Sequence, residues 1–437
     1  MTGLLWQWEE PQPKYLSYLR LVLAFGAAVF AFESYLDWRQ LKAIQKLRPP
    51  KILGDSYDKA EYKKTQSYNI DKWYFGKYKG LWSVCFSTFI LLAGFMPFLW
   101  AKSASLVARV GLDPKNEIYV AITYELLESL QGLIMGLPWS IYSTFVIEQR
   151  HGFNKQTPGL FVVDILKSIG LGIVILPLFV GGFTFVLQNT SPFIALYLWL
   201  FILGIQVIAL TIYPTVIAPL FNKFDPLPEG PLRHAIEELA GSLKFPLRKL
   251  FVIDGSKRSA HSNAYMYGFW KNKRIVLFDT LIEQCSQEEV VAVLAHELGH
   301  WKLSHTTKNF VLQQGILLAN LGLFTFARNS PRLFNSFGFT EVKPAFIAFT
   351  LFQLISSPVD EVIGFFNNML SRKFEFQADN FAVELGHASE LQGALRKLDA
   401  KNKSAQNVDH WYSTYHYSHP PLVERLSGIQ VEAKKAQ

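Results

Sequence analysis

Seven long apolar stretches constrain this chain more than any other feature of its sequence. Each is long enough to cross a hydrocarbon core of about 30 Å, which takes about 20 helical residues. Because 50% of the residues are hydrophobic and gather in such stretches, we expect an all-α polytopic membrane protein with seven transmembrane helices. The predicted spans are 18–35, 81–101, 118–147, 160–187, 193–221, 309–327 and 344–370.

Three of these stretches, the third, fourth and seventh, contain charged residues. Charges at membrane depth are costly and usually face a protein interior or a water-filled cavity. We therefore expect the helices to surround a polar interior, and the alternative is that the charges lie at the membrane interface. They are Glu125, Glu128, Asp164, Lys167, Asp360 and Glu361.

The distribution of Lys and Arg predicts the orientation of the chain. Seven crossings put the two termini on opposite sides, and one side carries 34 Lys and Arg whereas the other carries 7. Since cytosolic loops are enriched in these residues, the N-terminus is predicted to be lumenal and the C-terminus cytosolic. The first loop, 37–80, holds 11 of the 34 and leads to the same side.

Two regions outside the spans have the character of soluble protein. Residues 222–308 contain two β-rich segments, "KLFVIDGS" and "NKRIVLFD", which predict a small sheet with a hairpin around Lys271–Lys273. A helix follows, because Ser286 and Glu289 fit a capping box ahead of an apolar stripe. We divide the chain into 1–221 (five spans, with cytosolic loop 37–80), 222–308 (cytosolic α+β portion), 309–370 (two spans) and 371–437 (cytosolic tail).

The net charge of +8 indicates contact with anionic lipid headgroups. No basic run with interleaved aromatic residues is present, so nucleic-acid binding is not expected. Cys85 and Cys285 fall in a span and in a cytosolic segment, so no disulfide framework is predicted. Asn189 begins a glycosylation sequon, but its lumenal loop is so short that we expect no glycan there. The sequence carries no signal of an oligomeric state.

The segment "HELGH" at 296–300 is the strongest chemical signal in the chain. On a helix, His296 and His300 lie one turn apart on the same face, so both imidazoles can bind one ion. Zinc accepts such nitrogens, and Glu297 on the adjoining face is placed to contact a zinc-activated water. This zincin-like pattern predicts one Zn²⁺ per chain in a catalytic site.

A third ligand has to come from another part of the chain. The metzincin extension is absent, because positions 303 and 306 are Leu and Thr, which leaves His305 out of register. In "SRKFEFQADNFA", Glu375 and Asp379 are one helical turn apart among apolar residues. This pair suits a metal ligand, Glu375, and a carboxylate, Asp379, that accepts the free N–H of a ligand histidine. The alternative is a solvated helix face.

Taken together, "HELGH", "SRKFEFQAD" and "HYSHPPLVERL" (416–426) closely resemble the motifs of the type I CAAX prenyl endopeptidases of the endoplasmic reticulum. The resemblance extends over essentially the whole chain. It implies removal of the C-terminal tripeptide from prenylated CAAX proteins, with His296, His300 and Glu375 as zinc ligands and Glu297 as general base. It further implies that Asn263 and Arg425 bind substrate and that His419 stabilises the transition state.

The resemblance also implies location in the endoplasmic reticulum membrane, with the active site facing the cytosol where prenylated tails are made. Lys434 and Lys435 resemble the dilysine retrieval signal of proteins of this membrane, and the alternative is a frayed basic end.

Three other functions would keep the same motifs. A membrane quality-control zinc protease would cleave prenylated and bare peptides equally. A non-catalytic channel or scaffold would need zinc for stability but not Glu297. An intramembrane protease of the site-2 type would need the metal helix within a span, and the charges at Glu288, Glu289, Lys302 and Lys308 argue against that.

Overall fold

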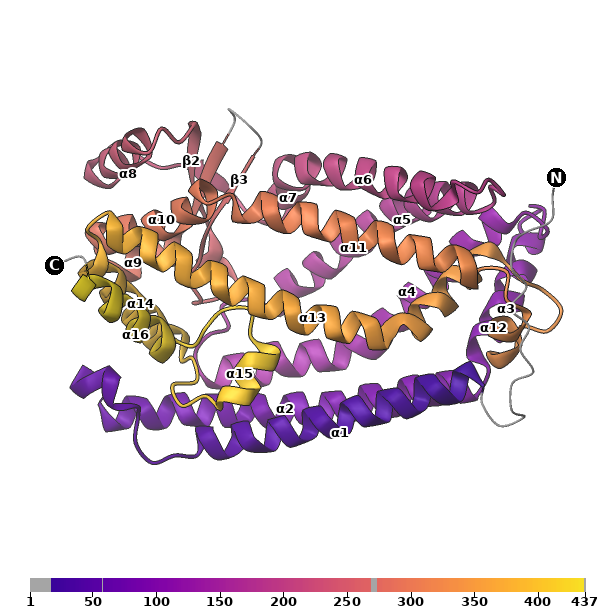
Figure 1. Ribbon diagram of the computed structural model, residues 1–437, viewed down its shortest axis with the longest axis horizontal. Helices are drawn as coiled ribbons and strands as arrows, with labels where there is room; N and C mark the ends of the chain where they lie inside the picture. Colours follow the sequence, from indigo (N-terminus) through magenta and orange to yellow (C-terminus); the bar gives the residue numbers. More distant parts are fainter. Residues whose placement is uncertain (1–16, 57, 269–272, 436–437) are drawn as a thin grey trace.

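The computed structural model describes residues 17–56, 58–268 and 273–435. Long helices run along the length of the molecule, and the sheet gathers with several shorter helices at the end where the C-terminus lies (Figure 1). The helix α1 (Tyr18–Ile44) begins at the opposite end.

The long apolar helices agree with the predicted membrane fold. Within the described residues, six helices are long and apolar enough to cross a bilayer, or seven if one bent pair forms a single span. After α1 they are α2 (Lys59–Leu92) with α3 (Phe95–Arg109), α4 (Glu117–Tyr142) with the π-helical η2 (Ser143–Glu148), α5 (Pro158–Leu187), α6 (Ile194–Ile212) with the π-helical η3 (Tyr213–Ile217) and α7 (Ala218–Phe221), α11 (His305–Ala327) and α13 (Ala345–Glu384).

The second predicted span, 81–101, is not one straight helix. The chain bends by 66° between α2 and α3. Gly94 adopts a left-handed conformation, φ 63°, which side-chain-bearing residues rarely adopt and which ends α2. Pro97 lies in the first turn of α3, where a missing N–H costs no intrahelical bond. The apolar pattern runs through the bend, so hydropathy alone could not locate it.

The boundary predicted at residue 370 does not coincide with the end of a helix. Helix α13 is 40 residues long and runs without interruption from the seventh predicted span into the segment that contains Glu375 and Asp379. Hydropathy falls after residue 370, but the residues that follow still favour helix. The same helix therefore spans the membrane and supplies the carboxylates.

The predicted sheet is present and has four strands in the order β1-β2-β4-β3. β2 pairs parallel with β4, whereas β3 pairs antiparallel with β4 as expected for the predicted hairpin. Lys271 and Asn272 of that hairpin lie outside the described residues. β3 occupies one edge of the sheet. The strands are β1 (Phe224–Pro226), β2 (Leu247–Ile253), β3 (Ala264–Tyr267) and β4 (Lys273–Phe278).

Shorter helices pack around this sheet and close the ends of the bundle. The hydrophobic residues of the sheet, α8, α10 and α14 form one core, and those of α3, α4, α5 and α13 form another. The shorter helices are η1 (Lys51–Ser56), α8 (Pro231–Ser242), η4 (Gly255–Lys257), α9 (Asp279–Gln284), α10 (Gln287–Lys302), α12 (Pro331–Ser336), α14 (Ala388–Asn402), α15 (His410–His416) and α16 (Leu422–Lys435).

Four of the six charged residues predicted at membrane depth are bonded to other parts of the protein. The Asp164 carboxylate pairs with Arg258 at 2.8 Å, which ties α5 to the segment before β3. The other bonds are Lys167 Nζ to the Leu220 carbonyl (2.7 Å), Ser356 Oγ to Asp360 (3.1 Å), and the Tyr415 hydroxyl to Glu361.

Candidate metal centre

Helix α10 begins with the predicted capping box. The Ser286 hydroxyl accepts the backbone N–H of Glu289, and the Glu289 carboxylate accepts the backbone N–H of Ser286 at 2.7 Å. Leu294 and Leu298 are fully buried in the core below the helix. The helix is therefore held at its start and along its apolar face, which fixes the direction of its histidines.

Gly299, between the two histidines, lets α10 and α13 approach closely. A Cβ at this position would lie 3.2 Å from the Cα of Ala378 and 3.1 Å from the ring of Phe381. Any larger residue would push against the backbone of α13. This close packing brings the histidines of one helix to the carboxylates of the other.

His296, His300 and Glu375 form a compact cluster in which the ligand atoms lie within 4.8 Å of one another. The Nε2 atoms of the two histidines are 3.2 Å apart. Glu375 Oε1 lies 3.3 Å from His300 Nε2, and Oε2 lies 3.6 Å from His296 Nε2. The cluster is largely buried, where an uncompensated carboxylate is costly.

These separations fit a zinc ion. Ligands in a tetrahedron around zinc at about 2.0–2.1 Å lie roughly 3.3–3.4 Å from one another. In addition, Glu375 Oε2 is buried and accepts no hydrogen bond from the described residues, although His419 Nδ1 lies 3.0 Å away. Two imidazole nitrogens and one carboxylate leave a position for water, as catalytic zinc sites require.

Asp379 joins the metal cluster to Arg425. Its Oδ1 lies 2.8 Å from His296 Nδ1, so the other ring nitrogen, Nε2, faces the metal position. Arg425 donates two hydrogen bonds to the same carboxylate, at 2.6 and 2.9 Å. Such a bidentate pair compensates the buried charge of Asp379 and fixes its rotamer.

The second histidine of the cluster, His300, has a partner that the sequence did not predict. His300 Nδ1 lies 3.0 Å from His305 Nδ1, and His305 Nε2 lies 3.0 Å from the Gln377 side-chain oxygen. A left-handed turn at Ser304 (φ 58°) starts α11 and brings His305 back beside α10. No sequence pattern predicts this turn. The presence of a third histidine only five residues after His300 was the one signal that could have indicated the contact.

The remaining predicted residues line a cavity of about 290 Å³ next to the cluster. Glu297 reaches it from α10, Asn263 from the residue before β3, and His419 from the loop before α16. The contact with the Glu375 carboxylate raises the pKa of His419. Arg425 lines the same cavity, so the structure brings all eight predicted site residues to one place.

Neither cysteine lies among these residues. Both are free, and Cys285 lies at the end of α9. Burial raises the pKa of the Cys285 thiol to about 11, so the thiol stays protonated near neutral pH.

Comparison with known proteins covers nearly the whole chain. Residues 40–223 match the family model described as CAAX prenyl protease N-terminal, five membrane helices, and residues 226–433 match peptidase family M48. The chain is 49% identical over 421 residues to the CAAX prenyl protease 1 homolog of Arabidopsis thaliana, covering 96% of this chain and 99% of the relative.

More distant relatives show the same coverage. Identity is 41% to the CAAX prenyl protease 1 homolog of Homo sapiens, over 97% of both chains. The crystal structure of S. mikatae Ste24p superposes with a TM-score of 0.90 at 37% identity, over 95% of this chain and 99% of that one.

Proposed function

The chain belongs to peptidase family M48 and is a membrane metalloprotease of the CAAX prenyl protease 1 type, and from this premise we propose its reaction. We propose that it uses one zinc ion to remove the C-terminal tripeptide from prenylated CAAX proteins. The observation that supports this most is the cluster of His296, His300 and Glu375 where a membrane-spanning helix meets the zincin-like helix.

In this proposal His296, His300 and Glu375 hold the zinc. A bound zinc ion supplies Lewis-acid polarisation of the scissile carbonyl and raises the acidity of water. Glu297 lines the cavity beside the ligands without belonging to their cluster, so its carboxylate is free to act as general base. It takes the proton of the attacking water and passes it to the leaving amine, which contributes typically about 10²–10⁴-fold in rate.

His419 and Asn263 are proposed to act on the substrate. His419 Nδ1 lies 3.0 Å from the Glu375 carboxylate, and the ring lines the cavity, where an imidazole N–H can donate a hydrogen bond to the developing oxyanion. One such donor typically lowers the barrier by about 2.7–4 kcal/mol. Arg425 is proposed to act mainly by positioning Asp379, and through it His296, while its side chain borders the substrate cavity.

Strand β3 is proposed to bind the peptide backbone. It is an edge strand that begins one residue after Asn263 and so runs from the cavity. An extended peptide can add to such an edge through main-chain hydrogen bonds, which do not discriminate between side chains. Preference for the substrate then comes from the prenyl chain, since each buried CH₂ contributes about 0.8 kcal/mol.

We also propose that the protein resides in the endoplasmic reticulum membrane with residues 222–308 and 371–437 on the cytosolic side. The bias of Lys and Arg supports this orientation. Lys434 and Lys435 end the exposed last turn of α16, which suits recognition by cytosolic machinery.

The test compares farnesylated and unfarnesylated CAAX peptides, using purified wild type and Glu297→Gln with zinc measured in both. We expect cleavage of the farnesylated peptide by the wild type, faster than of the bare peptide. Glu297→Gln should retain zinc and lose at least about 10²-fold in turnover. Equal rates on the two peptides would instead support a quality-control protease, and full activity of the variant would contradict the assignment of the base.

A further inference from the structure

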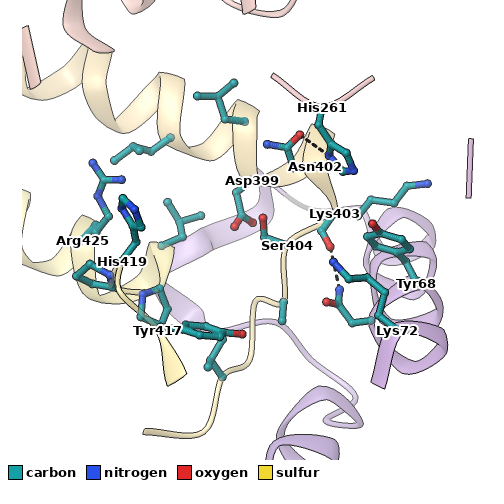
Figure 2. Close-up of a pocket in the computed structure, with 18 residues that line it drawn as sticks. Tyr68, Lys72, His261, Asp399, Asn402, Lys403, Ser404, Tyr417, His419 and Arg425 are labelled. Carbon is teal, nitrogen blue, oxygen red and sulfur yellow. Dashed lines mark hydrogen bonds between the residues drawn. The ribbon is translucent and has the colours of Figure 1, made fainter. Parts of the chain in front are cut away.

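A second cavity, of about 540 Å³, opens beside the metal centre. It shares Leu395, Leu398, His419 and Arg425 with the smaller cavity that contains the candidate metal ligands, so these residues separate two adjacent cavities. Figure 2 shows His419 and Arg425 at one end of this larger cavity and Tyr68, Lys72 and Lys403 at the other. A ligand bound at the metal centre therefore lies next to this larger cavity.

The far end of this cavity is basic. The ammonium of Lys72 lies over the ring of Tyr68, 4.9 Å from its centre, and forms no salt bridge within the described residues. Lys403 adds positive charge to this end, but its ammonium is engaged by the protein, since it donates a hydrogen bond to the His151 carbonyl at 2.7 Å and lies over the Phe153 ring, 4.9 Å from its centre.

Opposing charges near this end are few. Asp399 also lines the cavity, and Glu148 faces Lys72 from the π-helical η2. Glu148 is already engaged, because it accepts a hydrogen bond from Tyr68 at 2.7 Å and lies 3.4 Å from His261 Nε2. Arg425, at the other end, is bound to Asp379. The Lys72 ammonium is thus the charge most available to an anion that enters from the metal centre.

We propose that this cavity binds the C-terminal part of the substrate and that Lys72 binds its terminal carboxylate. The inference rests on the proposed function, because a substrate that is cut three residues from its C-terminus carries a free carboxylate close to the scissile bond. A released tripeptide spans about 10 Å when extended. The volume of the cavity suits a ligand of this class.

This assignment gives the enzyme a means of measuring distance from the chain end. The main-chain contacts along β3 fix no position in the sequence, whereas a carboxylate held by Lys72 fixes how many residues lie beyond the scissile bond. A hydrogen bond between the Lys72 ammonium and a carboxylate is also stronger than a hydrogen bond between two neutral groups. An internal peptide segment, or a chain that ends in an amide, lacks this anchor.

The experiment measures kcat and KM for one farnesylated CAAX peptide with a free C-terminal carboxylate and for the same peptide as the C-terminal amide. For the wild type we expect amidation to lower kcat/KM by about 10-fold, chiefly through KM. In Lys72→Met the free acid should fall to the level of the amide, while the amide itself is cleaved as by the wild type. Lys72→Arg should recover part of the preference.

Lys63→Met is the matched control. Lys63 lies on the same helix, α2, but nine residues away and on the opposite, exposed face, so its loss should leave the preference for the acid unchanged. Equal cleavage of acid and amide by the wild type would overturn the inference, and so would an equal loss on both peptides in Lys72→Met. Failure of the zinc-loaded wild type to cleave either peptide would instead overturn the proposed function itself.

Discussion

The Asp379 carboxylate lies between His296 and Arg425 and accepts hydrogen bonds from both. Replacing it with Asn keeps the shape but weakens the bond to His296 Nδ1 and removes the carboxylate that Arg425 binds with two hydrogen bonds. Because such partners orient metal ligands, we expect Asp379→Asn to bind zinc about 10–100-fold more weakly, as measured by competition with a chelator. Glu384→Gln, on an exposed part of the same helix, should bind zinc as the wild type does. Unchanged affinity in Asp379→Asn would mean that Asp379 does not orient the ligand.

Local sequence patterns indicated the residues of the cluster but not all of their neighbours. The HExxH spacing and a carboxylate pair one turn apart are local patterns, so they could be read directly from the sequence. The link from His300 through His305 to Gln377 depends on the left-handed turn at Ser304 and on the packing of two helices, and no local pattern reports either one.

Cys285 gives a test of burial near the metal helix. With its pKa raised to about 11 from the usual 9.0, roughly 100-fold less thiolate is present at pH 8 than in the unfolded chain. In a Cys85→Ser background we expect maleimide to react much more slowly with the folded protein than with the denatured one. Similar rates in the two states at pH 8 would contradict the buried, apolar surroundings of this thiol.

The contact between α10 and α13 is the element-level feature on which the site depends. In Gly299→Ala the new methyl group would press against the backbone of α13 at Ala378, and overpacking of this kind costs about 1–3 kcal/mol. This exceeds the gain of about 1 kcal/mol that Ala brings to a helix. We therefore expect lower stability in thermal unfolding and weaker zinc binding.

A second glycine provides the control for that substitution. Gly241 in α8 has no neighbour within 4 Å of its missing Cβ, so Gly241→Ala should leave zinc binding unchanged and stabilise the fold by about 0.4–1 kcal/mol. If both variants behaved alike, close packing at Gly299 would not be what brings the two helices together.

Hydropathy predicted where the long helices lie but not where they bend or end. The bend at Gly94 falls inside an apolar stretch, and α13 continues past the point where apolar residues stop. Both the bend and the longer helix escape prediction for the same reason. The hydropathy of a segment indicates whether it lies in lipid or in water, whereas backbone conformation and packing decide where a helix bends or ends. The small sheet and the capped helix were predictable since turn residues and caps mark their limits locally.

For the molecule as a whole, the unequal distribution of positive charge predicts one orientation. With 34 Lys and Arg on one side and 7 on the other, the C-terminus should face the cytosol. In intact vesicles of endoplasmic reticulum, an added protease should remove a C-terminal tag and spare an N-terminal one. Detergent should expose both tags. Protection of the C-terminal tag would place the metal centre in the lumen and exclude cytosolic substrates.

The proposed reaction requires that α10 and α13 meet at one zinc ion held by two imidazoles and one carboxylate. Zinc-edge X-ray absorption on the purified protein tests it directly. We expect one zinc per chain, with two imidazole nitrogens and oxygen ligands at about 2.0–2.2 Å, and loss of that zinc in Glu375→Ala. A sulfur ligand, or an unchanged spectrum in Glu375→Ala, would contradict it.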